Sequence, residues 1–210
     1  MKRTLRIAIV FAFTCAALAA FSNFAQAQRI DIAFGVSTAI APGPSVLAGF
    51  DSQGNPIVQQ SLTGGAYPGF SGDVLFWHNL GVGAEVSWKA SQGSGLYQYY
   101  DGVNYRPVFY NFNAVYSPKL ASHAYLELVG GIGAISTHFY VCQDCQQFGG
   151  SGEVASSSHF DADFGGGIKL YLKHGFFIRP EARVYWINNN TNFVGSHATR
   201  VGASIGYTFK

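Results

Sequence analysis

Apolar and polar residues alternate along the last stretch of the chain, from Ala198 to Phe209. A repeat of two residues is that of a β-strand with one apolar face, and a helix cannot use it. An unpaired edge strand exposes a row of backbone N–H and C=O groups, so this strand needs a neighbour on both sides. Pairing with the first strand of the same chain would supply the missing neighbour and close a barrel.

The same alternation recurs upstream, and it divides the chain into eight predicted strands. Their expected ranges are Arg29–Ala39, Ala66–Trp77, Leu80–Lys89, Val108–Tyr116, Ala124–Phe139, Phe160–Leu170, Phe176–Ile187 and Ala198–Phe209. Short turns alternate with long connections at Ile40–Gly65, Ala90–Tyr105, Tyr140–Ser158 and Asn188–His197. The pattern predicts an all-β fold, an eight-stranded antiparallel up-and-down β-barrel. Pro180 predicts a local irregularity in the seventh strand, because proline cannot donate to the ladder.

The polar face of these strands carries charges of both signs, while the central part of the apolar face carries none. The charged positions on the polar face are Asp31, Asp73, Glu85, Lys89, Glu127, Asp161, Asp163, Lys169, Arg179, Glu181, Arg183 and Arg200. An Arg or Lys that faces lipid at mid-depth costs about 2–4 kcal/mol. We therefore expect these side chains to form a paired charge network inside a transmembrane barrel. Arg106 has the apolar parity but lies at a loop margin.

Glycines share the polar face with the charges, at positions 81, 83, 131, 133, 165, 167, 202 and 206. The interior of an eight-stranded barrel is only just wide enough for side chains, so small residues belong on the inner face. Trp77, Trp88, Trp186 and other aromatic residues lie near strand ends, as interfacial girdles do. A soluble lipocalin-like barrel, which buries its apolar face around a ligand, is the alternative.

The first 27 residues have the pattern of a signal peptide. Basic residues precede a short apolar segment, Ile7–Ala20, and Ala25-Gln26-Ala27 is a small-x-small cleavage site. We therefore expect residues 28–210 to form one exported domain. Without the signal, ten Lys and Arg stand against eleven Asp and Glu, so no basic excess favours nucleic acid. Charged residues make up 11% of the chain, against about 25% in a soluble domain.

Two cysteines remain after the expected cleavage, Cys142 and Cys145, in a polar connection. Oxidation is the rule for exported chains, so a local disulfide is the preferred interpretation. A thioredoxin-like redox motif would need a strand-to-helix context, and a metal site would need further ligands at suitable spacing. The sequence predicts no cofactor and no metal.

The chain resembles the outer membrane protein β-barrel family, the broad group that includes OmpA-like transmembrane domains. The resemblance rests on the signal peptide, the eight-strand pattern, the strands at 126–133 and 177–183, and the aromatic closing strand. The chain departs from that pattern in ending on Phe209-Lys210 and in lacking a periplasmic peptidoglycan-binding domain. The resemblance implies a monomer in the cell outer membrane, surrounded by membrane lipid and lipopolysaccharide. It also implies the barrel assembly machinery and periplasmic chaperones as partners during biogenesis.

A structural or surface-interaction role is the expected function, with a lumen plugged by paired charges and long extracellular loops. A small-conductance pore is one alternative. Another is a lipid A-modifying barrel enzyme, because Ser136 and His138 share a face near the outer end of the fifth strand. That enzyme would need a nucleophile, a base and a group that orients the base. No acidic partner for His138 is evident on the same parity.

Overall fold

The computed structural model describes residues 29–96, 103–142, 151–188 and 192–209, apart from 51, 53 and 55. Its strands are β1 (Arg29–Ile40), β2 (Val46–Phe50), β3 (Pro56–Gln59), β4 (Tyr67–Trp77), β5 (Leu80–Trp88), β6 (Gly93–Leu96), β7 (Val103–Tyr116), β8 (Lys119–Ala121), β9 (Ala124–Cys142), β10 (Ser151–Tyr171), β11 (Phe176–Ile187) and β12 (His197–Phe209). Among these residues there is no helix long and apolar enough to cross a membrane.

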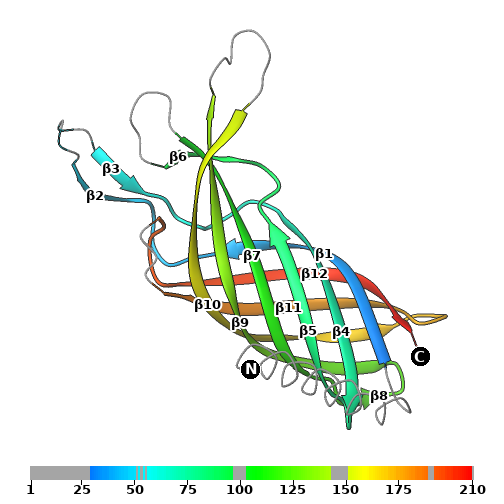
Figure 1. Cartoon of the computed structure of the whole chain (residues 1–210). Coiled ribbons are helices and arrows are strands. Elements are labelled where there is room, and N and C mark those ends of the chain that lie inside the picture. The colour runs from blue at the N-terminus through cyan, green and yellow to red at the C-terminus, as the bar shows by residue number, and fades with distance from the viewer. Residues whose placement is uncertain are drawn as a thin grey trace, which may run out of the picture.

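Eight of these strands form a closed antiparallel barrel, as the alternation predicts (Figure 1). Each pairs with its neighbour in the order β1, β4, β5, β7, β9, β10, β11 and β12. The closing strand β12 pairs with β1 from Phe209 opposite Ile30 to Thr199 opposite Ile40. The edge exposed by the last strand is thus covered by the first, and β6 and β8 add short extensions to β7 and β9.

One end of the barrel, which we call the turn end, carries the short connections. The β4–β5 connection is a two-residue turn at His78 and Asn79, whose φ angles are 43° and 69°. Positive φ at both residues is the geometry of a type I′ turn, whose twist matches that of the flanking strands. The opposite end, the loop end, carries the β2–β3 hairpin and the extended β9–β10 hairpin (Figure 1).

The two strand faces are separated as the sequence predicts. In β1 every even-numbered residue from Ile30 to Ile40 is exposed, while Asp31, Ala33, Ser37 and Ala39 are buried. The outer wall is strongly apolar, with Phe112 71% and Ile132 58% exposed. This arrangement is the inverse of a soluble lipocalin-like barrel, so that alternative is wrong for this fold.

Three of the long connections differ from the sequence expectation, since the connection at 90–105 contains β6 and the start of β7. The connection at 40–65 contains the β2–β3 hairpin, and much of 140–158 is strand, since β9 extends to Cys142 and β10 begins at Ser151. A paired strand outside the membrane has water on both faces, so it needs no apolar alternation to be stable. A strand of this kind therefore leaves no alternation in the sequence from which it could be predicted.

Pro180 lies opposite a gap in the β10–β11 ladder. Pairs are formed between Gly167 and Glu181 and between Leu170 and Ile178, in the same register, but not at the two positions between them. The missing N–H of proline leaves this part of the ladder without a donor. The expected irregularity is thus a local loss of pairing rather than a bulge.

Two expectations fall outside the described residues. Residues 1–28 are not among the described residues, so the signal peptide stays a prediction. Cys142 ends β9, but its side chain and the whole of Cys145 are not described, so the disulfide stays a prediction as well.

Candidate functional site

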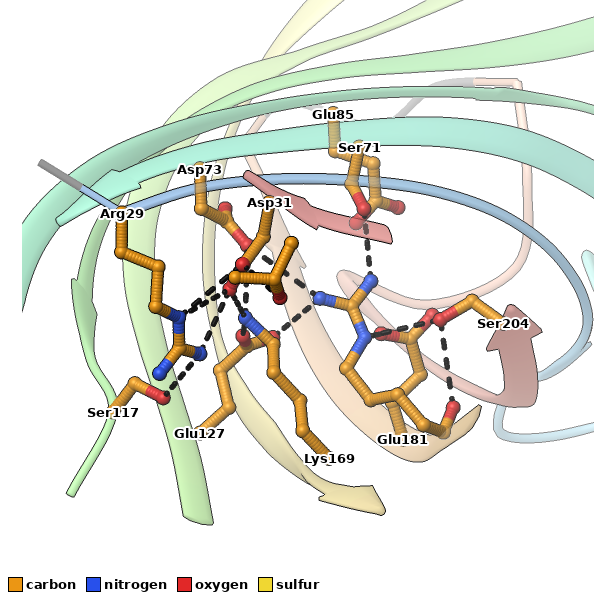
Figure 2. A network of polar contacts seen from close by, with 12 residues as sticks. Arg29, Asp31, Ser71, Asp73, Glu85, Ser117, Glu127, Lys169, Glu181 and Ser204 are labelled. Carbon is orange, nitrogen blue, oxygen red and sulfur yellow. Dashed lines mark hydrogen bonds and ion pairs between the residues drawn. The ribbon is translucent and has the colours of Figure 1, made fainter. Parts of the chain in front are cut away.

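Charged side chains from five strands meet in the lumen near the turn end of the barrel (Figure 2). We call this group the turn-end cluster. Its members are Arg29, Asp31, Asp73, Glu127, Lys169, Arg179 and Glu181. All but Arg29 and Glu181 have less than a tenth of their surface exposed. Buried charges are tolerated only when they are paired and hydrogen-bonded, which explains why the members lie so close together.

Lys169 lies at the centre of three carboxylates in this cluster. Its Nζ lies 2.6 Å from Asp31 Oδ2 and 3.4 Å from Asp73 Oδ2, and it also contacts Glu127. Oxygen atoms of these three acids lie within 4.8 Å of one another, a spacing that could hold a metal ion. The ammonium group of Lys169 already supplies a cation at this point, so the geometry calls for no metal.

Arg179 links the turn-end cluster to strands on opposite sides of the lumen. It donates to Glu127 Oε1 at 2.5 Å, to Ser71 Oγ at 2.8 Å and to Ser204 Oγ at 3.0 Å. Its Nε also lies 2.9 Å from Glu181 Oε2 (Figure 2). One guanidinium group therefore ties together β4, β9, β11 and β12, which fixes their positions across the lumen.

A second group, the mid-barrel cluster, lies nearer the loop end and consists of Glu85, Asn111, Asn113, Asp161, Asp163, Arg183 and Arg200. Arg183 and Arg200 are directly opposite each other on β11 and β12, an unfavourable pairing of like charges. Glu85 compensates for it, because its carboxylate lies 2.8 Å from Arg183 Nη2 and also pairs with Arg200. Arg200 further donates to Ser37 at 3.1 Å.

Two of the predicted network residues form no ion pair within the described part of the chain. Asp161 is fully buried and accepts a hydrogen bond from Asn111 Nδ2 at 2.5 Å, while its Oδ2 has no partner. Lys89 lies just beyond the end of β5 and above the ring of Tyr105, with Nζ 5.1 Å from the centroid. Burial lowers the pKa of the Lys89 ammonium group. The network is thus less completely paired than the charge pattern implies.

Apolar side chains close the lumen above the mid-barrel cluster. This aromatic plug consists of Ala39, Leu62, Tyr67, Tyr105, Phe109, Ile135, Tyr185, Ile187, Phe193 and Ala198. Leu62 and Phe193 come from connections rather than barrel strands, and each is only 1% exposed. A backbone hydrogen bond of 3.0 Å from Val194 N to Gln60 O holds the two connections together. The guanidinium group of Arg200 lies against the rings of Phe109 and Tyr185, which joins plug and cluster.

Little free space remains in the middle of the lumen, whereas a pocket of about 230 Å³ at the turn end is lined by Arg29, Tyr125, Tyr171 and Thr208. The cavity lined by Ser37, Ser71, Arg179 and Arg200 measures about 10 Å³, which is the room that one water molecule needs. The inward-facing glycines contribute to this packing. A Cβ at Gly83 would collide with Asp73, and one at Gly131 would collide with Asn113.

Sequence reasoning missed several lumen residues. Arg29 has the same parity as Asp31 and donates to it at 2.8 Å from Nη2, so parity alone could have found it. Asn111 and Asn113 have that parity too, but neutral amides were not counted with the charges. Leu62 and Phe193 carry no periodic signal, because they lie in connections.

On the outer surface, His138 has a polar partner that the sequence pattern does not reveal. His138 does have an acidic partner, since its Nδ1 lies 2.8 Å from Glu153 Oε1. A register shift in β10 between Glu153 and Ala155 places Glu153 opposite Tyr140 and turns it to the face of His138. Ser136 is not hydrogen-bonded to His138 and accepts instead from Ser158 Oγ at 3.0 Å.

Comparison with known proteins gives matches only at the level of structure. No family model matches the sequence, and no curated protein matches it either. Neisserial surface protein A is 10% identical with a TM-score of 0.56, over 87% of this chain and 97% of that one. A major outer membrane protein of Thermus thermophilus is 10% identical with a TM-score of 0.55, over 88% and 100%.

Ail, the attachment invasion locus protein of Yersinia pestis, is 14% identical in its complex with the heparin analogue sucrose octasulfate. Its TM-score is 0.52, over 87% of this chain and 99% of that one. At such low identity these likenesses concern the fold. The closed barrel, its apolar outer wall and these structural matches together show that the chain has the fold of the OmpA-like eight-stranded outer membrane barrels.

Proposed function

We propose that this protein is a monomeric barrel of the outer membrane that supports the membrane and presents a surface to the outside, with a lumen closed to ions. The observation that carries the proposal is the filling of the lumen from the turn-end cluster to the aromatic plug. Two ionic clusters and the aromatic plug follow one another from the turn end to the loop end. The proposed role requires no cofactor.

The proposal places the turn end in the periplasm and the loop end outside the cell. Short periplasmic turns and longer external connections are the rule for bacterial outer membrane barrels. Cleavage of the signal peptide after Ala27 would leave the new N-terminus next to Arg29, at the turn end. Membrane lipid and lipopolysaccharide would surround the wall, and the barrel assembly machinery and periplasmic chaperones would act during biogenesis.

A second candidate function is hydrolysis of an acyl ester of lipid A at the outer surface. The hydrogen bond between His138 and Glu153 favours it, because a carboxylate that orients an imidazole is one part of a hydrolytic triad. Ser136 would supply the nucleophile, and its hydroxyl would have to leave Ser158 and turn to His138. This rearrangement is the reason why hydrolysis ranks second.

Conductance tests the closed lumen directly. The purified protein in planar bilayers with concentrated KCl is expected to give no single-channel events, because no water-filled path crosses the clusters. Phe193→Ala is also expected to stay silent, since both ionic clusters remain below the shortened plug. A steady conductance of the unaltered protein would contradict the proposal.

Stability tests the structural role of the mid-barrel cluster. Glu85→Gln leaves Arg183 and Arg200 without their shared counter-charge, so the free energy of unfolding is expected to fall by about 3–5 kcal/mol. Glu153→Gln, at a carboxylate 47% exposed, is the control and is expected to cost less than about 1 kcal/mol. Urea unfolding in lipid vesicles measures both, and equal costs would contradict a structural role for the cluster.

Release of fatty acid from lipid A tests the second candidate. If the protein is a hydrolase, His138→Ala lowers the rate by about a hundredfold or more, because the general base is lost. His159→Ala is a matched control, since this histidine also contacts a serine, with Nε2 3.1 Å from Ser157 Oγ. Absence of any release by the unaltered protein removes this candidate.

A further inference from the structure

The outer wall changes from apolar to polar at one level across β7, β9 and β10. Tyr110, Ala134 and Phe160 form one outward-facing row of paired residues, and the row contains no charge. In the next row towards the loop end, Val108 pairs with Ser136, and Ser136 pairs with Ser158. The apolar belt of the membrane therefore ends at this level.

The row beyond this boundary contains Arg106, His138 and Ser156. Arg106 on β7 pairs with His138 on β9, which pairs with Ser156 on β10, so the three residues lie side by side on the outer face. Arg106 is partly buried on this wall. It is thus a cation at the margin of the lipid, on a face whose next row towards the turn end contains two serines and whose following row is apolar.

The register also gives the depth of Arg106. Trp88 on β5, a residue of the expected aromatic girdle, pairs with Val108. Arg106 is two residues farther along β7, about 7 Å at the usual rise of a strand. With the strand tilt usual in such barrels, this is about 5 Å along the membrane normal. The guanidinium group thus lies beyond the girdle, at the level of the lipid headgroups.

Arg106 lacks the partner that the inward-facing arginines have. Its Nε is buried and has no hydrogen-bond partner, and no carboxylate among the described residues forms an ion pair with it. Its Cζ lies 5.8 Å from the centre of the Tyr140 ring, which positions the guanidinium group without neutralising it. A partly buried guanidinium group without a counter-charge is ready to bind an anion.

His138 and Ser156 complete the same row. Glu153 is hydrogen-bonded to Nδ1 of His138, which fixes the ring and leaves Nε2 without a partner among the described residues. The side chain of Ser156 is exposed beside it. A guanidinium group, an imidazole and a hydroxyl in one row match the several oxygen atoms of a phosphate group better than a single carboxylate.

We propose that Arg106, His138 and Ser156 bind the phosphate group of an anionic lipid in the outer leaflet. The lipid is favoured over a soluble phosphate because the apolar wall that begins two rows below, at Tyr110, Ala134 and Phe160, offers a surface for its acyl chains. The proposal rests on the lipid-facing orientation of the wall in the proposed function. It requires neither a closed lumen nor hydrolysis.

Binding of lipid A to the full-length protein in maltoside micelles, followed by native mass spectrometry, tests this site. The unaltered protein is expected to bind the bisphosphorylated lipid at least about tenfold more tightly than the same lipid without phosphates. In Arg106→Gln this preference is expected to disappear, while Arg106→Lys keeps part of it because a point charge remains. His138→Gln is expected to reduce the preference by a smaller factor.

Lys119→Gln is the matched control, because it removes one positive charge from an exposed residue at the opposite, turn end. It is expected to bind as the unaltered protein does. Faster gel migration before heating verifies that each variant is folded. Should Arg106→Gln fail to fold, His138→Gln and Ser156→Ala carry the test.

The outcomes separate the possibilities. An undiminished preference in folded Arg106→Gln, or no preference in the unaltered protein, would overturn the proposal. Displacement of the lipid by millimolar inorganic phosphate would overturn the assignment to a lipid and indicate a soluble anion. The mass spectra also show whether the bound lipid stays intact, so a failure of the hydrolase candidate leaves the binding result unaffected.

Discussion

Every charge carried by the membrane-spanning part of the barrel strands has to be placed either against lipid or inside a very narrow lumen. A charged side chain at mid-depth on the outer wall costs several kcal/mol, so the inside is the only place for most of them. Inside, each charge loses water and is stable only next to an opposite charge or a hydrogen-bonding group. This double constraint explains why Lys169, Arg179 and Arg183 each lie next to a carboxylate.

The filling of the lumen follows from that constraint together with the size of the barrel. Long arginine and lysine side chains reach across to carboxylates on opposite strands, and inward-facing glycines leave them room. Two further residues, Leu62 and Phe193, enter from the connections and seal the loop end. The outer surface then remains as the place for interaction, and its polar row at Arg106 lies where lipid headgroups meet the wall.

Much of this arrangement can be predicted from the sequence, because one period of two residues fixes both the strands and their faces. The strand pattern and the closing pair of β1 and β12 follow from alternation, and the inward parity of the charges follows from the cost of a charge that faces lipid together with the glycines on the same face. The partner of His138 could not be predicted, since a register shift in β10 reverses the parity at Glu153. Leu62 and Phe193 could not be predicted either, because no local pattern says that a connection folds into the mouth of a barrel.

The central claim is that the outward face meets lipid, and one pair of substitutions tests it directly. Ile132 and Leu120 are both 58% exposed, but Ile132 lies within the apolar belt and Leu120 at the turn end. Urea unfolding in lipid vesicles is expected to show a loss of about 2–4 kcal/mol for Ile132→Arg and about 0–1 kcal/mol for Leu120→Arg. Equal small losses for both variants would contradict the account, because they would mean that water, not lipid, covers the middle of the wall.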